Sequence, residues 1–401
     1  MKKTIKLAVV AALALGATSA FATNGSAMIG MGAKTRGMGG TGIGVGHGAE
    51  SALSNPALIT TIKGNNEISF GGTVFMPDVK YSSTSASEVD SDSDFFVIPS
   101  VSVASKVNDN FYAGVGMWGT GGLGVDYRDS NAHMNMVTAL QNMQFGVPLV
   151  YTANKFAIGI TPIVQYTSLD INYNGHMSGM GGPDAVGAGV ANDVTMGYNL
   201  GMSYTMNNLT MGAVYKSEIK SDIKDVLRNA ISAMGVNYTN TKISAPAEAG
   251  VGVSYKMGGH TFAVDYKRIF WEDAETYKDF GWEDQNVIAL GYEFAQDKWA
   301  VRAGFQHAKG AVQDNTGKNL AVDQGAFGPG LTNMFNALGF PGTQESHITL
   351  GGTYAFNDML SLDLAAVYGL ENKETLPIVM GGSAEVKHSE TSFSVQLNYA
   401  F

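Results

Sequence analysis

The chain has 401 residues, a formal net charge of −10 and no cysteine. The negative charge argues against a nucleic-acid-binding protein, in which a basic patch would be expected, and the lack of cysteine excludes disulfides and thiolate metal sites. With 51 glycines, 15% charged residues and a mean hydropathy of +0.01, the composition is typical of alternating β-strands rather than of apolar membrane helices.

Residues 1–22 have the pattern of a secretory signal peptide. Three lysines precede an apolar run at 7–15, and Ala20-Phe21-Ala22 places small residues around a cleavage site. A transmembrane anchor would need about 20 apolar residues, roughly twice the length of this run. We therefore predict cleavage before Thr23 and export of the chain.

Residues 23–62 do not alternate and are dense in Gly, Ala and Met. If the strands that follow close into a barrel of about fourteen strands, the lumen must be filled or conduct water, and we predict that this segment fills it as a plug, or hatch. A disordered periplasmic tail is the alternative, but Pro56 after Asn55 favours a fixed turn. The predicted gating residues of the hatch are Asn24, Gly25, Asn55, Pro56 and Ala57.

Residues 63–401 are predicted to form the barrel wall, because short apolar/polar alternations are separated by connections that alternate between tight and long. The tight connections, rich in Asn, Asp and Gly, are 106–110, 152–155, 205–208, 256–259, 295–298 and 356–358. The long ones are 77–94, 127–140, 173–193, 218–244, 271–284, 307–346 and 369–390. This arrangement matches a bacterial outer-membrane barrel with periplasmic turns and extracellular loops. The predicted fold class is all-β, a transmembrane antiparallel β-barrel of about 14 strands with an N-terminal plug.

One face of each strand is predicted to contact lipid. In the last strand, Ser392, Ser394, Gln396 and Asn398 alternate with apolar residues that end on the aromatic Phe401. Tyrosines and tryptophans near the strand ends are typical of interfacial girdles. A soluble β-sandwich, the main alternative, also alternates, but it needs neither lipid-side aromatics nor a signal peptide.

Five short motifs occur in order along the chain. They are the N-terminal segment that closes on Asn55-Pro56-Ala57, followed by 110–116, 215–220, 353–357 and 398–401. Together they resemble the outer-membrane long-chain fatty-acid transporter family (FadL type, including its aromatic-hydrocarbon uptake relatives) over essentially the whole mature chain, although Leu58 stands where the family usually has Gly. The resemblance implies a fourteen-stranded barrel blocked by a hatch, capture of hydrophobic ligands at the extracellular loops, and lateral release through a gap made by a kink in the third strand.

The strand that matches this third strand runs from about 110 to 127 and is rich in glycine. Clustered glycines inside a strand weaken pairing and favour a bulge or bend. The alternative is that they only relieve crowding against the hatch. The glycines predicted to form the lateral opening are Gly119, Gly121, Gly122 and Gly124.

Candidate ligand contacts are apolar residues of the long loops. Methionine suits ligands of variable shape because its side chain is flexible and polarisable, and 326–340 is an apolar stretch inside an expected exposed loop. Lipid contact or loop packing is the alternative for each residue taken alone. The candidates are Met134, Met136, Met143, Met177, Met180, Phe327, Leu331, Met334, Phe335, Leu338 and Phe340.

A carboxylate cargo would need a cation, and five basic residues are candidates: Lys34, Arg36, Lys216, Lys267 and Arg302. The first two belong to the hatch, and the others point inward by strand phase. Asp265 and Glu293 also point inward near Arg302, so for Lys267 and Arg302 we prefer a charge-balanced network that holds the hatch. The span 166–173, where a fatty-acid carrier is expected to have a basic residue, has none, which leaves neutral hydrocarbons, including aromatics, open as cargo.

The sequence predicts no enzyme, because none of the seven histidines has a recognisable nucleophile partner by spacing. His347 is the best candidate for a catalytic histidine among them, but a weak one. We predict a passive outer-membrane transporter of hydrophobic compounds, preferably long-chain fatty acids, that needs no cofactor and no metal. Its partners would be its cargo, outer-membrane lipid and lipopolysaccharide, and it would act as a monomer. The alternatives are an aromatic or alkane hydrocarbon channel of the same family, a general porin, or an adhesin.

Overall fold

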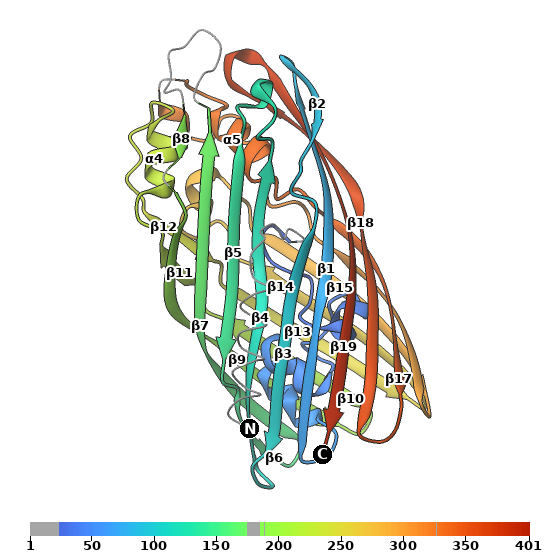
Figure 1. Cartoon of the computed structure of the whole chain (residues 1–401). Helices are drawn as coiled ribbons and strands as arrows, with labels where there is room; N and C mark the ends of the chain where they lie inside the picture. Colours follow the sequence, from blue (N-terminus) through green and yellow to red (C-terminus); the bar gives the residue numbers. More distant parts are fainter. Residues whose placement is uncertain (1–23, 175–184, 188, 326) are drawn as a thin grey trace.

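The computed structural model describes residues 24–174, 185–187, 189–325 and 327–401. Fourteen antiparallel strands close into a barrel, because the first strand pairs with the last from Glu67↔Ala400 to Ser83↔Ala384 (Figure 1). The predicted antiparallel β-barrel of about 14 strands is therefore confirmed. Among the described residues, no helix is both long and apolar enough to cross a membrane.

The wall strands follow one another around the barrel in chain order. One of them is interrupted at Pro148, which has no N–H to donate to a neighbouring strand. Its two parts, β5 and β6, are counted together as one wall strand. The strands are β1 (Asn66–Ser83), β3 (Phe96–Lys106), β4 (Phe111–Asp126), β5 (Val137–Gly146) with β6 (Leu149–Ala153), β7 (Phe156–Tyr173), β9 (Ala191–Met206), β10 (Leu209–Lys216), β13 (Glu248–Met257), β14 (His260–Ile269), β15 (Gln285–Gln296), β16 (Trp299–His307), β17 (Ser346–Ala355), β18 (Leu360–Pro377) and β19 (Ser383–Ala400).

All six predicted tight turns join neighbouring strands at one end of the barrel, which we call the turn end; the C-terminus lies there (Figure 1). Two predicted long loops are wrong in their bounds. Instead of a loop at 77–94, β1 runs on to Ser83 and returns through β2 (Ala86–Asp90), and instead of a loop at 369–390, β18 and β19 continue to Pro377 and from Ser383. These extensions were missed because their outward side chains are polar, so that the alternation of lipid-facing and lumen-facing residues no longer marks a strand.

The predicted faces of the strands are present. In β19, Phe393, Val395 and Leu397 are about half exposed (51%, 52% and 45%), whereas Ser392 and Gln396 between them are each 2% exposed. The apolar side chains therefore form the outside of the barrel, and the small polar ones face the lumen.

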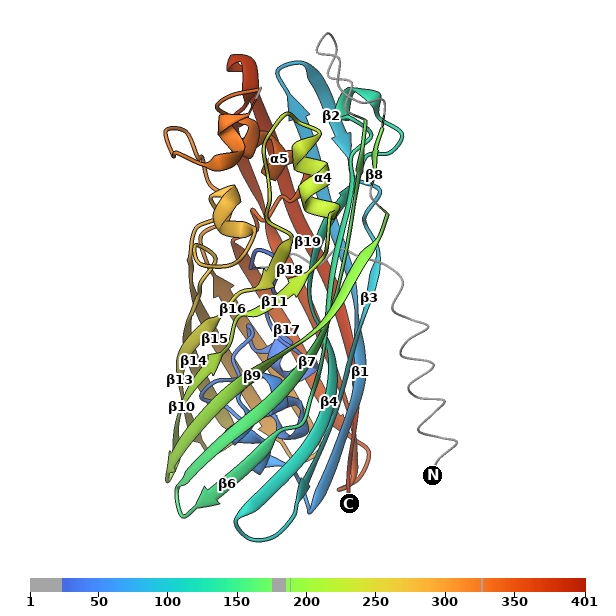
Figure 2. The same ribbon diagram turned by 90° about the vertical axis from the view of Figure 1, so that its left-hand side faces the viewer.

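Residues 24–62 lie inside the turn-end half of the barrel (Figures 1 and 2). Asn55 explains the local fold, because its side-chain oxygen accepts the N–H of Ala57 (3.1 Å) and its amide donates to the carbonyl of Ile43 (2.8 Å). Pro56 then begins the next helical turn with its φ already suited to it. The helical segments are α2 (Ala33–Gly37), η1 (Gly48–Glu50), α3 (Ser51–Ser54) and η2 (Pro56–Thr61).

The long connections fold over the opposite end, which we call the loop end, and form a cap (Figure 2). The cap buries the largest apolar cluster of the described residues. Its elements are η3 (Asn131–His133), β8 (Val186–Gly187), β11 (Ile219–Asp222), α4 (Val226–Ser232), β12 (Lys242–Ala245), η4 (Tyr277–Phe280), η5 (Ala321–Gln324), α5 (Leu331–Gly339) and η6 (Val379–Gly381).

Candidate functional site

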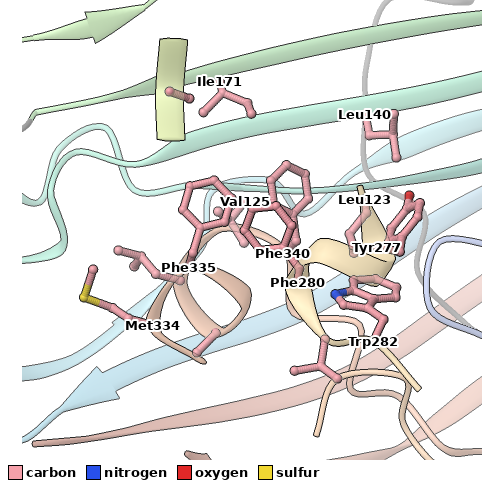
Figure 3. Close-up of a cluster of buried hydrophobic side chains, with 14 of the residues drawn as sticks. Leu123, Val125, Leu140, Ile171, Tyr277, Phe280, Trp282, Met334, Phe335 and Phe340 are labelled. Atoms are coloured by element: carbon pink, nitrogen blue, oxygen red, sulfur yellow. The ribbon is translucent and has the colours of Figure 1, made fainter. Parts of the chain in front are cut away.

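The cap contains a small, partly open apolar cavity built by loops that are distant in the sequence. Figure 3 shows Phe335 and Phe340 gathered with Phe280, near Leu123 and Val125 of β4. The Phe280 and Phe335 rings lie 5.1 Å apart, and the Tyr277 and Trp282 rings 4.6 Å apart. The cavity is lined by Leu227, Ile243, Thr276, Tyr277, Phe280, Trp282, Phe335, Asn336 and Phe340. None of these side chains carries a charge at neutral pH.

The polar groups of this cavity bond to one another. Trp282 Nε1 donates to Asn336 Oδ1 (3.1 Å), and Asn336 Nδ2 donates to the Phe280 carbonyl (2.9 Å). Buried polar atoms that have found partners leave little reason for water to enter. The cavity can therefore offer an apolar surface to a hydrocarbon.

Most of the predicted ligand contacts belong to the apolar cluster of the cap. Met143 does not: it lies on β5 in the same phase as the outward-facing Phe145 and is half-buried. Met177 and Met180 lie outside the described residues. Phe327 packs against the cluster, and its buried members among the candidates are Met134, Met136, Leu331, Met334, Phe335, Leu338 and Phe340.

The tip of the N-terminal segment, residues 24–28, lies directly beneath the cap. Asn24 donates its side-chain N–H to Gln306 Oε1 (2.8 Å), and Ser26 Oγ is 3.3 Å from the Tyr277 hydroxyl. Burial raises the pKa of Tyr277, so its phenol stays neutral. Gly25 has φ +63°, and a Cβ there would come within 2.7 Å of the Trp271 ring. The tip thus separates the cap cavity from the lumen.

The same tip pairs with β4 at the predicted glycine cluster. Met28 N donates to the Thr120 carbonyl (3.3 Å) and Gly122 N donates to the Ser26 carbonyl (3.0 Å). On the other side of β4, the register with β5 shifts between Gly119 and Gly121, which is the predicted irregularity.

The loop-end half of β4 is also not paired with β3, its other neighbouring strand. Pairing between β3 and β4 ends at Ser100↔Trp118, although β3 itself continues to Phe96, where it pairs with Phe75 of β1. At Thr120 and Gly122 the backbone of β4 is instead bonded by the tip of the N-terminal segment, and Leu123 to Val125 are buried. β4 is therefore drawn inward from the wall.

The glycines of β4 let neighbouring segments of the chain approach the strand closely, and they also let the strand bend. A Cβ on Gly121 would lie 2.5 Å from the Ser26 carbonyl oxygen, and one on Gly119 would lie 2.7 Å from the Ile98 side chain. Gly124 is similarly close to the Thr138 carbonyl of β5. The two interpretations of this cluster, bending and relief of crowding, both apply.

Two adjoining cavities, each of about 50 Å³, lie between the N-terminal segment and the wall. They share the side chains of Met28, Met31, Lys216 and Glu248. One of them also reaches Thr120 and Gly121 of β4. The lumen thus contains space that is lined by flexible methionines and borders the irregular strand.

These cavities contain two of the predicted cations around a single carboxylate. Lys216 Nζ is 3.1 Å and Lys267 Nζ is 3.8 Å from the same oxygen of Glu248. Asp265, which lies near Lys267, accepts the backbone N–H groups of Gly42 (2.7 Å) and Ile43 (2.8 Å) instead of forming an ion pair. Lys216 and Lys267 therefore share the carboxylate of Glu248 as their ion-pair partner.

Of the other predicted cations, Lys34 joins the N-terminal segment to the wall, whereas Arg302 joins two neighbouring wall strands. Lys34 lies 3.6 Å from Asp363, and Arg302 lies 2.6 Å from Glu293. The expected Arg302–Glu293 contact is present, but Asp265 is not part of it. Arg36 differs, since its hydrogen bond is to the neutral Ser392 Oγ (2.5 Å); burial lowers its pKa to about 10, so it remains charged at neutral pH.

Sequence reasoning missed several residues of the site. Glu248 and the cap residues Leu227, Ile243 and Trp282 were not predicted, although aromatic residues in the loop at 271–284 offered a signal. Within the described ranges, no group of three or more His, Asp or Glu side chains is placed to hold a metal.

Comparisons with known proteins agree with this geometry. Residues 7–401 match the family model described as outer membrane protein transport protein (OMPP1/FadL/TodX). The chain is 22% identical to the long-chain fatty acid transport protein of Escherichia coli O6:H1 over 90% of this chain and 92% of that protein, and equally to that of Salmonella typhi.

Solved structures share the fold. A Pseudomonas aeruginosa FadL homologue superposes with a TM-score of 0.70 and 15% identity, covering 94% of this chain and all of that one. The toluene transporter TodX of Pseudomonas putida superposes with a TM-score of 0.67 and 19% identity, covering 93% of this chain and 99% of the other.

Proposed function

The chain belongs to the OMPP1/FadL/TodX family and is an outer-membrane transporter of hydrophobic compounds, and from this premise we propose that its cargo is a long-chain fatty acid taken up passively. The observation that carries the proposal is the pair Lys216 and Lys267, which share one carboxylate inside a methionine-lined cavity. A fatty-acid carboxylate would join this cluster as a second acceptor, while its chain occupies the apolar space that opens when residues 24–28 are displaced.

Capture is proposed to begin in the cap cavity at the extracellular side. Moving a hydrocarbon chain out of water contributes about 25 cal/mol per Å² of apolar surface buried, so no nucleotide or redox cofactor is needed to drive entry. Net flux then follows the gradient of the cargo. The family is one of transporters, and we propose no catalytic role.

The segment 24–62 is proposed to act as the hatch. Its tip bonds to the cap at Tyr277 and to β4 at Thr120, so a ligand that enters the lumen from the cap must displace residues 24–28. The remainder is fixed by side chains of the wall, as Gln396 Nε2 donates to Glu50 Oε2 (2.8 Å) and Asp265 accepts two close N–H groups. The tip can thus move while the rest of the hatch stays in place.

Release is proposed to be lateral, beside the loop-end half of β4. Support comes from the end of β3–β4 pairing at Ser100↔Trp118 and from the cavity that reaches Gly121. The space between the two strands is filled by apolar side chains, Ile98 of β3 and Met28 of the hatch among them. A cargo leaving here would stay in contact with apolar groups until it met lipid.

A neutral hydrocarbon is the second candidate cargo. The specific observation in its favour is the cap cavity, whose lining of aromatic and aliphatic side chains has no charged group. TodX, with the same fold, is named a toluene transporter. Lys216 and Lys267 should contribute to the binding of a fatty acid but not to the binding of a neutral hydrocarbon.

Competition binding in detergent tests the proposal. We expect the double variant Lys216→Met, Lys267→Met to lose about 10- to 100-fold in affinity for oleate, because a hydrogen bond to a charged group contributes about 1.5–3 kcal/mol, and to keep its affinity for toluene. The matched control is Lys155→Met in an exposed turn, which should change neither. Unchanged oleate affinity in the double variant, with toluene bound more tightly than oleate, would instead support the hydrocarbon channel.

A further inference from the structure

A second cluster of ionisable groups lies between the hatch and the wall at β17 and β19; β19 is separated from β4 by β1 and β3. It consists of Arg36 on α2, His347 on β17, and His388 and Glu390 on β19. All four side chains are at most 3% exposed. The transport route proposed above does not use them.

Both histidines point at one carboxylate. His347 Nε2 is 3.3 Å from Glu390 Oε2, and His388 Nε2 is 3.4 Å from Glu390 Oε1 without a hydrogen bond. The charge of Glu390 also acts on Arg36. Glu390 is therefore the counter-charge available to a guanidinium and to two imidazoles.

The cluster is incompletely bonded. Buried atoms without a hydrogen-bond partner are Arg36 Nε and Nη1, His347 Nδ1, both ring nitrogens of His388, and Glu390 Oε1. Such atoms are rare in folded proteins and concentrate where a water, an ion or a change of state is involved. Since the described residues offer no metal-binding group and Arg36 is cationic, a metal ion does not explain them.

The elements packed around the cluster add no further charge. On β1, the residues opposite Glu390 and His388 are Pro77 and Val79. On β18, Gly369 lies opposite Glu390, and the neutral Gln344 covers that glycine. The charge of the site therefore depends on the two histidines.

We propose that Arg36, Glu390, His347 and His388 form a protonation-controlled latch that holds the hatch at neutral pH and loosens it in acid; the inference rests on the proposed hatch. While both imidazoles are neutral, Glu390 and Arg36 balance each other. A proton on one histidine makes it compete with Arg36 for Glu390, and a proton on the second leaves the buried site with surplus positive charge, which is unfavourable.

When Glu390 no longer balances the charge of Arg36, only the attachment of the hatch at Arg36 is weakened. Arg36 then keeps only its bond to the uncharged Ser392, and it is repelled by the imidazolium groups. The neighbouring anchor, Lys34 with Asp363, contains no histidine and stays charged through the same pH range. Acid should therefore weaken α2 without releasing the whole hatch.

Ion conductance of the purified protein in planar bilayers tests the latch. With the extracellular side taken from pH 7.5 to 5.0, we expect the open fraction of the wild-type protein to rise at least about tenfold, which corresponds to roughly 1.4 kcal/mol. His347→Asn with His388→Asn should make the profile flat. His260→Asn, a control that removes a histidine bonded to Tyr292 elsewhere in the wall, should keep the wild-type profile.

The outcomes separate the two proposals. Low conductance that does not change with pH in the wild-type protein would overturn the latch and leave the hatch intact, and this result needs no variant to fold. High conductance at every pH would show that the hatch does not close the lumen. A wild-type profile in the double histidine variant would overturn the latch by assigning the pH response to other groups.

Discussion

Gly121 shows how one residue connects the hatch to the wall. It lies beside the register shift of β4, and its missing side chain lets the Ser26 carbonyl approach to within 2.5 Å of where a Cβ would be. Any larger residue must push the tip of the hatch away or straighten the strand. Because both movements alter the border of the lumen cavity, we expect the proposed transport route to be sensitive to this position.

Gly121→Val is expected to reduce uptake of a long-chain fatty acid about tenfold, since overpacking of this kind costs ~1–3 kcal/mol and falls on the contact between hatch tip and β4. Uptake by cells expressing the variant measures this. The control is Gly352→Val on β17, where a Cβ has only the Ala300 carbonyl nearby, at 3.3 Å. Wild-type uptake by Gly121→Val would remove β4 from the route.

At the scale of elements, the hatch is held asymmetrically. Polar side chains of the wall, including Gln396, Asp265 and Asp363, bind residues 34–50, whereas the tip makes a few bonds to the cap and to β4. Local unfolding takes place first where the fewest contacts must be broken. The tip is thus the part of the hatch expected to open when a ligand arrives.

Deletion of residues 24–60 should convert the barrel into an open channel, because a wall of fourteen strands encloses more space than its own side chains fill. Liposome swelling with small sugars would report this as a rise in rate from near zero. The migration of unheated protein on a gel serves as the control for a folded barrel. A folded deletion variant that stays impermeable would contradict the role of the hatch.

The elements of the wall were predictable because their signals are local. Period-two alternation and Asn- or Gly-rich turns such as 205–208 placed the wall strands and the six tight turns correctly. The extensions of β1 and β18 beyond the lipid were missed, because polar residues such as Lys80 and Lys373 there replace the apolar outward face. The irregularity of β4 was predicted from its glycines, but its pairing with the hatch was not.

The site was only partly predictable, because it depends on contacts between distant segments. Sequence phase correctly placed Lys216 and Lys267 in the lumen, but it could not show that both reach Glu248, which requires the register of three strands. The cap cavity joins Leu227, Phe280 and Phe335 from three loops that carry no periodic pattern. Loop residues meet through tertiary packing, for which a single sequence has no simple signal.

At the scale of the whole molecule, the cavities lie in an order that fits the proposed route, which is interrupted by the tip of the hatch. An oily cavity in the cap lies above the hatch tip, cavities with a shared lysine pair lie beside the hatch, and one of these borders β4. The outside of the barrel is apolar where lipid is expected. Such a route suits a cargo that avoids water throughout, and it does not suit a sugar or an ion.

The most direct test of this account is the uptake of labelled oleate by cells that lack their own outer-membrane fatty-acid transporter, measured with and without this protein and alongside a labelled small sugar. We expect the protein to restore oleate uptake and to leave sugar entry unchanged. Entry of the sugar without that of oleate would contradict the account and identify the protein as a general pore.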